Sequence, residues 1–408
     1  MTVLPHARAA FPASRSAVGG RGHVAVFNVP QHGHVNPTLA VVAELVARGY
    51  RVSYAVTEEF AAQVKAVGAT PVVYQDAAAG QEAPEDLAAG VTQAVMQTVV
   101  ALPDLAAAFA DDHPEIVLYD MYAWAGPLLA ARWRVPAVQL APTHLPYEGI
   151  VQELLGVADI AQIPGYAQLA AALASHGVTA SVHELTLAPR EAVAFFPRSF
   201  QRRAETVAAE KVAFVGPALG DRSYQGHWQA PASGLPVLLV SLGSQYTRRP
   251  SFYRACVQAF AELPWHVVMS VGAGVDPREI GPVPDSIEIH SSVPQLSVLA
   301  QASAFVTHGG MGSTMEALAY GVPLVAVPQM AEQRANAHQI EQLSLGMHLP
   351  RELATPQALR EAVLQVAADS DVARAVAAMR RQVQEAGGAA RAADVIEQAL
   401  RRQPAVNR

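Results

Sequence analysis

The 408-residue chain is long enough to form two domains, and its 51% apolar and 15% charged residues are typical of a well-packed globular protein. Its net charge of −7 argues against nucleic acid or an anionic membrane surface as the principal partner. The single cysteine, Cys256, excludes an internal disulfide and suits a reducing compartment, so a cytoplasmic location is expected.

The first half of the chain alternates apolar strands with helices. We expect residues 1–21 to form a flexible tail, because they lack the continuous apolar stretch of a signal peptide. No uncharged apolar run is long enough to span a bilayer. Asn36 and Pro37 suit the N-cap and first position of a helix, which is therefore expected to begin there. Strands are predicted at 23–29, 52–56, 71–74, 116–119 and 137–140.

The second half repeats this pattern after an interruption. Glycine, proline and polar residues at 216–236 indicate an interdomain linker. Further strands are predicted at 237–242, 266–271, 304–307 and 324–327. The alternation predicts an α/β protein with two doubly wound parallel sheets, one in residues 22–215 and one in 237–385. Two such Rossmann-like domains would face each other across a cleft at the carboxyl ends of their strands.

Two candidate acid–base residues follow predicted strands of the first half. His34 lies in Gln31-His-Gly-His-Val-Asn-Pro37, and Asp120 directly follows the strand at 116–119. A histidine whose second ring nitrogen is held by a carboxylate is a good general base near neutral pH. In the alternative interpretation Asp120 caps a helix and His34 fills a turn, and the residues alone leave both open. No metal is expected here, because His32 and His34 lack further ligands at zinc-site spacing.

A glycine-rich turn marks a candidate phosphate site in Val306-Thr-His-Gly-Gly-Met-Gly-Ser-Thr-Met-Glu316. A strand, a glycine turn and a helix start aim backbone N–H groups and the positive end of a helix dipole at one point. Glu316 could close a capping box with Ser313 or accept the hydroxyls of a ribose. The phosphate candidates are His308, Gly310, Gly312, Ser313 and, in a weaker second turn after a strand, Ser244.

The motifs that would indicate other nucleotide enzymes are missing. The chain has no G-x-x-x-x-G-K-[ST] sequence, so it is not a P-loop NTPase. The first strand does not lead into G-x-G-x-x-G, which counts against an NAD dehydrogenase.

Several motifs together resemble the family-one glycosyltransferases of the GT-B fold, in particular the bacterial macrolide glycosyltransferases. The motifs are Gly33-His-Val-Asn-Pro37, Val293-Pro-Gln295, His308-Gly-Gly-Met-Gly-Ser313 and Glu332-Gln333. The resemblance extends from His23 to about Leu400, and it implies that residues 386–408 form a C-terminal helix and tail that pack on the first domain. It implies an inverting, metal-independent transfer of a hexose from UDP-glucose to a macrolide hydroxyl, which inactivates the antibiotic.

The same resemblance assigns roles to individual residues. His34 would deprotonate the acceptor hydroxyl and Asp120 would orient His34. The donor would contact Val293 and Gln295 at the base, Glu316 at the ribose, His308, Gly312 and Ser313 at the diphosphate, and Glu332 and Gln333 at the sugar. Acceptor-pocket candidates, which also fit ordinary core positions, are Met121, Tyr122, Trp124, His144 and Tyr147.

One departure from the family leaves the donor open. The relatives carry a tryptophan immediately before Val-Pro-Gln, where this chain has Ser292. Losing its stacking on the base would cost on the order of 1 kcal/mol, so a dTDP-sugar donor remains an alternative.

Several other functions remain alternatives at this stage. A phenolic or polyketide acceptor and a non-catalytic sugar-nucleotide-binding helper both stay open. A nucleotide-sugar epimerase is disfavoured by Gly33-His-Val-Asn-Pro37, and a lipid-acceptor transferase by the missing basic apolar patch. The expected partners are a nucleotide-sugar donor and a hydrophobic small molecule, without nucleic acid, membrane or tightly bound cofactor. The chain is expected to be a monomer or homodimer.

Overall fold

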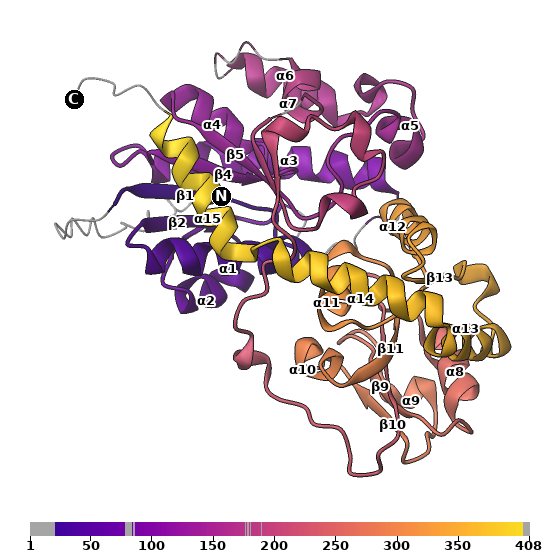
Figure 1. The fold of residues 1–408 in the computed structure, drawn as a ribbon. Coiled ribbons are helices and arrows are strands. Elements are labelled where there is room, and N and C mark those ends of the chain that lie inside the picture. The colour runs from indigo at the N-terminus through magenta and orange to yellow at the C-terminus, as the bar shows by residue number, and fades with distance from the viewer. Residues whose placement is uncertain are drawn as a thin grey trace, which may run out of the picture.

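The computed structural model describes residues 21–77, 84, 86–175, 177, 179, 181–188 and 190–402. The predicted tail at 1–21, apart from Arg21, and the end of the chain beyond 402 lie outside these residues. Two parallel sheets with helices around them organise the rest, one in each half of the chain (Figure 1). The predicted α/β class with two Rossmann-like sheets is therefore confirmed.

The first sheet has seven strands in the order β3-β2-β1-β4-β5-β6-β7. They are β1 (His23–Phe27), β2 (Arg51–Val56), β3 (Thr70–Val73), β4 (Ile116–Asp120), β5 (Ala137–Ala141), β6 (Ala192–Ala194) and β7 (Val212–Phe214). The helices of this half are α1 (His32–Ala47), α2 (Glu58–Ala66), α3 (Leu87–Ala108), α4 (Ala125–Trp133), α5 (Ile150–Leu155), α6 (Gly165–Ser175) and α7 (Val182–Thr186). Every residue of β1 and of β4 is buried, as expected for strands covered by helices on both faces.

The second sheet has six strands in the order β10-β9-β8-β11-β12-β13. They are β8 (Val237–Ser241), β9 (His266–Ser270), β10 (Ile287–His290), β11 (Ala302–Thr307), β12 (Leu324–Ala326) and β13 (Gly346–His348). Its helices are α8 (Pro250–Phe260), α9 (Pro277–Ile280), α10 (Gln295–Leu299), α11 (Met311–Tyr320), α12 (Ala331–Gln342), α13 (Pro356–Ala368), α14 (Ser370–Glu385) and α15 (Gly388–Arg401). Strand order reverses between β1 and β4 and between β8 and β11, the points where open α/β sheets bind ligands.

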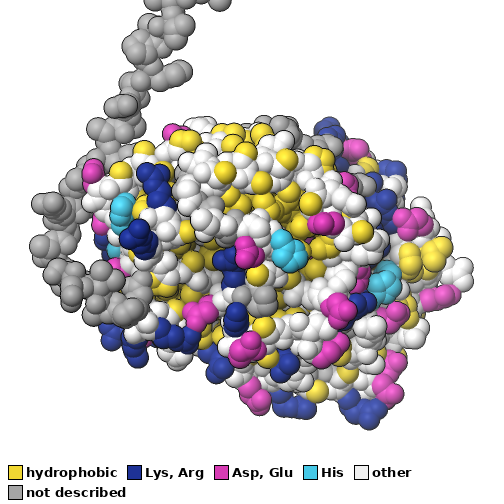
Figure 2. Space-filling model, turned by 90° about the horizontal axis from the view of Figure 1, so that it is seen from above, with side chains coloured by type: hydrophobic (Ala, Val, Ile, Leu, Met, Phe, Trp, Pro, Cys, Tyr) yellow, Lys and Arg dark blue, Asp and Glu magenta, His cyan; other side chains and the backbone are white. Residues whose placement is uncertain are grey.

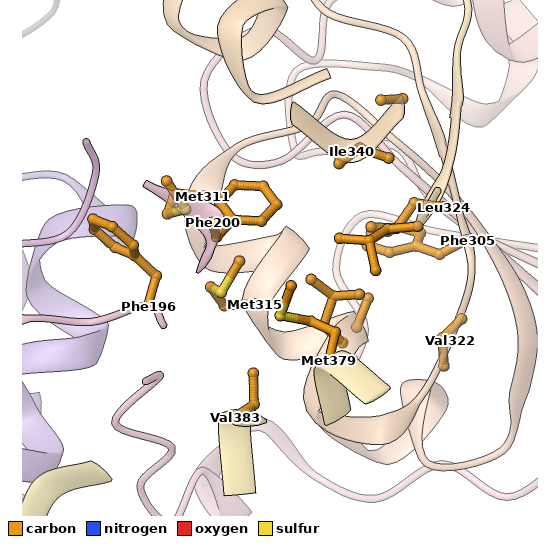
Figure 3. Close-up of a cluster of buried hydrophobic side chains, with 14 of the residues drawn as sticks. Phe196, Phe200, Phe305, Met311, Met315, Val322, Leu324, Ile340, Met379 and Val383 are labelled. Carbon is orange, nitrogen blue, oxygen red and sulfur yellow. The ribbon is translucent and has the colours of Figure 1, made fainter. Parts of the chain in front are cut away.

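The two halves share part of their hydrophobic core. Phe196 and Phe200 of the first half pack with Met311 and Met315 of α11 and with Met379 of α14 (Figure 3). The end of the chain then returns to the first half, because α14 leads into α15, which packs on α1 (Figure 1). This shared packing sets the carboxyl ends of the two sheets against each other.

The first helix begins earlier than the sequence predicted. The structure places its N-cap at Gln31, so the expected start at Asn36 and Pro37 is wrong, and Pro37 lies inside α1. Proline at this interior position removes one hydrogen bond of the helix and crowds the carbonyl of Gly33. As a result His34 is held in the first turn of a helix rather than in a loop.

The expectation that no apolar run could span a membrane is not met by helix α3. Among the described residues, α3 is the one helix whose length and apolar composition would allow it to cross a membrane. It packs against α4 and α6, and the core helices of soluble proteins often have the same length and composition. Over the first half, the surface facing the viewer in Figure 2 has hydrophobic side chains gathered at its centre and charges of both signs around them.

Candidate functional site

A cavity of about 480 Å³ lies between the two sheets, a size within the roughly 300–1,000 Å³ of ligand pockets. Both halves of the chain contribute to its lining, which comes from the ends of strands, from the loops and helix starts that follow them, from α3, and from residues 222 and 225. The predicted site residues that line it are His34, Tyr122, Ser244, Val293, Gln295, His308, Gly310, Gly312, Ser313, Glu316, Glu332 and Gln333.

The structure brings His34 and Asp120 together. The ring Nδ1 of His34 lies 2.7 Å from Oδ2 of Asp120, which is fully buried behind it. Because the carboxylate accepts the Nδ1 proton, Nε2 is left with the lone pair that a substrate hydroxyl needs. The pair therefore has the arrangement of a general base and its orienting carboxylate.

Asp120 also shapes the local backbone. Its Oδ1 accepts a hydrogen bond from the backbone N–H of Tyr122 at 2.9 Å. The next helix, α4, has Trp124 as its N-cap, so Asp120 closes a turn and does not cap the helix. Both oxygens of the carboxylate are thus occupied, which fixes the orientation of Oδ2 toward His34.

The charges around His34 raise its proton affinity. Burial by itself would lower the pKa of His34, but the charge and hydrogen bond of Asp120, together with the charge of Glu332, raise it above the ordinary value of 6.5. A more basic imidazole is a stronger proton acceptor once it is deprotonated.

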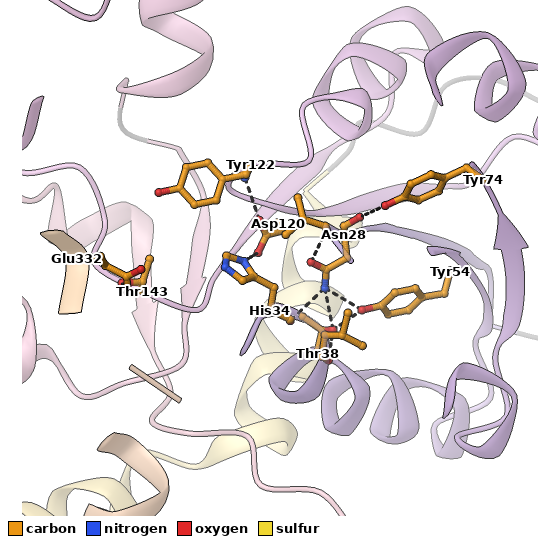
Figure 4. Close-up of polar contacts among 11 residues, drawn as sticks. Asn28, His34, Thr38, Tyr54, Tyr74, Asp120, Tyr122, Thr143 and Glu332 are labelled. Carbon is orange, nitrogen blue, oxygen red and sulfur yellow. Dashed lines mark hydrogen bonds and ion pairs between the residues drawn. The ribbon is translucent and has the colours of Figure 1, made fainter. Parts of the chain in front are cut away.

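A buried polar network holds the backbone beneath His34 (Figure 4). Nδ2 of Asn28 donates to the backbone oxygen of His34 at 3.1 Å and to the hydroxyl of Tyr54 at 2.8 Å. Oγ1 of Thr38 lies 2.5 Å from the same tyrosine hydroxyl, and the hydroxyl of Tyr74 donates to the backbone oxygen of Asn28 at 2.8 Å. Asn28 was not among the predicted site residues, because nothing in the sequence around it indicates that its amide contacts the backbone of His34.

The glycine-rich turn forms an open helix N-terminus at the cavity. Helix α11 begins at Met311 with Gly310 as its N-cap, so Ser313 lies in the first turn and the alternative of a capping box between Ser313 and Glu316 is wrong. The N–H groups of this first turn have no partner within the helix. A Cβ added at Gly312 would meet nothing within 4 Å, which shows that the cavity is open there.

His308 is packed tightly beside this helix start. A Cβ at Gly243 would lie 2.7 Å from Nε2 of His308, and one at Gly310 would lie 2.3 Å away, so both positions need glycine. Burial lowers the pKa of His308 to about 4. The ring is therefore neutral near pH 7 and offers an anion a hydrogen bond rather than a full charge.

Glu316 is engaged by an arginine that the sequence analysis missed. Arg222, from the predicted linker, lies 2.7 Å from Oε1 of Glu316, and both side chains are largely buried. Nε2 of Gln295 donates to Oε2 of Glu316 at 2.6 Å and to Oγ of Ser313 at 3.3 Å. Arg222 follows a Gly-Asp pair in a stretch that reads as a loop, so nothing local indicated its partner.

Glu332 connects the two halves across the cavity. Its Oε1 accepts a hydrogen bond from Oγ1 of Thr143 at 2.7 Å, and Figure 4 shows this pair across from the Asn28 network, with His34 between them. The neighbouring Gln333 is buried, and its Oε1 accepts from the backbone N–H of Gln329 at 2.8 Å.

Most of the acceptor candidates lie away from the cavity. Tyr122 lines it, whereas Trp124, His144 and Tyr147 are buried in the core and Met121 is not among the lining residues. His144, for example, stacks on Phe200 with ring centroids 6.0 Å apart. The wall on this side instead includes residues of α3 that the sequence analysis did not single out, namely Leu87, Gly90, Val91, Gln93, Ala94 and Gln97.

Comparison with known proteins places this geometry in a family. Residues 254–398 match the family model described as "Erythromycin biosynthesis protein CIII-like, C-terminal domain". The chain is 40% identical over 392 residues to "Oleandomycin glycosyltransferase" of Streptomyces antibioticus, which covers 93% of this chain and 91% of the relative. It is also 40% identical to "NDP-glycosyltransferase YjiC" of Bacillus licheniformis over 93% of this chain and 98% of that relative.

A solved structure agrees with the sequence comparisons. The crystal structure of the glycosyltransferase of kitacinnamycin superposes with a TM-score of 0.83 at 38% identity, covering 94% of this chain and all of that one. Similarity over nearly the full length includes both sheets and the cavity between them. The chain therefore belongs to the GT-B macrolide glycosyltransferase family and is a glycosyltransferase.

Proposed function

We propose that this enzyme transfers glucose from UDP-glucose to a hydroxyl of a macrolide antibiotic, with inversion at the anomeric carbon and without a metal ion. The observation that carries the proposal is the His34–Asp120 pair, which shares one cavity with the open N-terminus of α11. A base and an anion site on opposite walls suit an in-line displacement. We assign the acceptor to residues 22–215 and the donor to 237–385.

The reaction would proceed in one step. Nε2 of His34 takes the proton of the acceptor hydroxyl as its oxygen forms a bond to the anomeric carbon. The bond between that carbon and the phosphate oxygen breaks, and the nucleoside diphosphate leaves from the opposite face with the electron pair. An α-linked donor then gives a β-glycoside. Holding both substrates in one cavity supplies their alignment.

The leaving diphosphate would be stabilised by this chain's own dipoles. The first-turn N–H groups at Gly312 and Ser313 would hydrogen-bond the phosphate oxygens, and neutral His308 would donate one further bond. Ser244 and Gly310 also line the cavity and are further candidate contacts. A chelator should therefore leave the transfer rate unchanged.

The remaining donor contacts follow from the cavity lining. We assign the ribose to Glu316, which Arg222 and Gln295 hold in place. We assign the nucleobase to Gln295 and Val293. Glu332 and Gln333 are assigned to the sugar hydroxyls. Because Glu332 also contacts Thr143, the sugar would be bound where the two halves meet.

The choice of nucleobase in the donor depends on Ser292. This residue lines the cavity next to Val293 and offers the nucleobase no aromatic ring. A dTDP-sugar is therefore the second candidate donor. Ser292→Trp should tighten binding of a uridine donor by about two- to tenfold, since aromatic stacking contributes roughly 0.5–1.5 kcal/mol. An unchanged affinity would show that another side chain covers the base.

The acceptor is assigned from the wall formed by α3 and Tyr122. This wall combines apolar Leu87, Val91 and Ala94 with the amides of Gln93 and Gln97. Such a lining suits a hydrophobic molecule with a few hydroxyl groups. The relative named for oleandomycin supports a macrolide, while phenols and other polyketides are the alternatives.

A mass-spectrometric transfer assay tests the whole proposal. UDP-glucose and dTDP-glucose are offered separately with a panel of macrolides and phenols. We expect a gain of one hexose on a macrolide with UDP-glucose. His34→Ala should abolish transfer but retain nucleotide binding, and His183→Ala, an exposed histidine on α7, is the matched control. Unchanged function in His34→Ala would favour a non-catalytic helper.

A further inference from the structure

Three side chains that commonly bind metals meet on the second half of the chain, outside the lining of the cavity. One ring nitrogen each of His338 and His348 and one carboxylate oxygen of Glu341 lie within 4.8 Å of one another. His338 and Glu341 are three positions apart on α12 and therefore share one face of this helix. His348 is the last residue of β13, which packs on α12.

The backbone brings the two histidines together through a short connection. Helix α12 ends at Gln342, and β13 begins at Gly346 and pairs with β12 at the edge of the sheet. The rings of His338 and His348 stand nearly perpendicular, with centroids 4.8 Å apart. Their proximity is thus set by a helix and a strand, which hold side chains more firmly than loops do.

The ring of His348 has a nitrogen without a partner. Its Nε2 is shielded from solvent and has no hydrogen-bond partner in the part of the chain that the structure describes. Because buried polar atoms are nearly always hydrogen-bonded, an unpartnered ring nitrogen beside two other potential metal ligands points to an ion at this place.

We propose that His338, Glu341 and His348 bind a divalent transition-metal ion of the zinc type, which joins α12 to the edge strand β13. Two imidazoles and a carboxylate suit Zn²⁺, Co²⁺ or Ni²⁺, whereas Mg²⁺ and Ca²⁺ prefer oxygen ligands. Ligand atoms about 2.1 Å from one tetrahedral zinc stand roughly 3.4 Å apart. His338 and Glu341 are exposed, so small side-chain rotations close the present spacing.

The ion would bind outside the cavity that is proposed for the transfer reaction. It ties the edge strand β13, which is otherwise paired on one side, to the C-terminal part of α12. With three protein ligands, water completes its coordination. The site does not depend on the proposed donor or acceptor, so its test can fail without affecting them.

Zinc titration of the full-length, tag-free protein, stripped with a chelator, tests the proposal. We expect calorimetry to show one tight equivalent of Zn²⁺ and saturating Zn²⁺ to raise Tm, because an ion that binds only the folded state stabilises it. His338→Gln and Glu341→Gln, both at exposed positions, should weaken binding by roughly tenfold or more. His183→Gln, at an exposed histidine of α7, should bind as the wild type does.

Two results would overturn the proposal. Equal zinc affinity in the wild type, His338→Gln and Glu341→Gln would place the bound ion elsewhere on the protein. Competition by Mg²⁺ at a similar concentration would show nonspecific binding to carboxylates. Co²⁺ gives an independent readout, because loss of its visible absorption band in His338→Gln identifies an imidazole ligand.

Discussion

Replacing Asp120 by asparagine tests the proposed base most directly, because it changes charge and hydrogen bonding at nearly constant volume. Asp120 accepts two hydrogen bonds, one from His34 Nδ1 at 2.7 Å and one from the backbone N–H of Tyr122 at 2.9 Å. An asparagine has a single acceptor oxygen. If that oxygen stays with Tyr122, the amide NH₂ faces His34, which favours the tautomer with its proton on Nε2.

The size of the effect follows from this geometry. A buried hydrogen bond to a charged group is worth about 1.5–3 kcal/mol, which corresponds to roughly a 10- to 150-fold loss of kcat. The wrong tautomer would add to this loss, toward the roughly 10⁴-fold seen when a triad aspartate is replaced. We therefore expect kcat of Asp120→Asn to fall by at least about 10-fold, with a similar KM for the donor.

The pH profile of kcat/KM separates this role from a structural one. Asp120 raises the pKa of His34, and the base must be neutral, so activity of the wild type should rise with pH through that pKa. In Asp120→Asn this rise should move to lower pH, because burial is left to lower the pKa of His34. A variant with wild-type kcat and an unmoved profile would refute the assignment of the pair, provided that circular dichroism shows native folding.

Further predictions concern the residues around this pair and the stability of the fold. Asn28→Ala should reduce stability by about 1–3 kcal/mol, since it removes the amide that donates to the backbone oxygen of His34 and to the hydroxyl of Tyr54. The kcat should fall while donor KM stays similar, and an unchanged kcat would deny Asn28 a positioning role. Arg222→Gln should lower the free energy of unfolding in urea by about 3 kcal/mol, because Glu316 would keep a buried charge without its arginine. Arg222→Lys should restore part of the lost stability. Equal stability of the wild type and both variants would contradict the ion pair. Burial lowers the pKa of His144 to about 3 and that of His308 to about 4, below the ordinary 6.5, so below that pH the unfolded chain binds more protons than the folded one. The contribution of these two histidines to the free energy of unfolding should therefore be fully present above pH 6.5 and should decrease as the pH falls toward 4. Thermal unfolding measured across this pH range would detect the decrease. A Tm that does not change with pH would be inconsistent with neutral buried histidines.

The sequence by itself determined the class of the fold. Strands such as those at 23–27 and 237–241 are short apolar runs that alternate with helices, and only parallel sheets covered on both faces use such strands throughout. The glycine-rich stretch before Ser313 was likewise visible, because an anion site at a helix start is built from consecutive residues. Local patterns of this kind need no knowledge of distant parts of the chain.

Helix starts were less certain, because neighbouring residues offered competing signals. Asn36 and Pro37 have the local preferences of a helix start, yet α1 begins at His32. Ser313 and Glu316 have the spacing of a capping box, yet Glu316 instead pairs with Arg222. A cap contributes typically about 1 kcal/mol, which the burial of side chains in tertiary packing readily exceeds.

The tertiary structure alone decided which polar residues meet in the cavity. Arg222 reaches Glu316 from the stretch between the sheets, and Thr143 reaches Glu332 across 189 positions of the chain. The wall formed by α3 replaced aromatic candidates such as Trp124, which packs in the core. These contacts depend on how the two sheets pack together, and that packing is a sum of many long-range interactions that no local spacing in the sequence records.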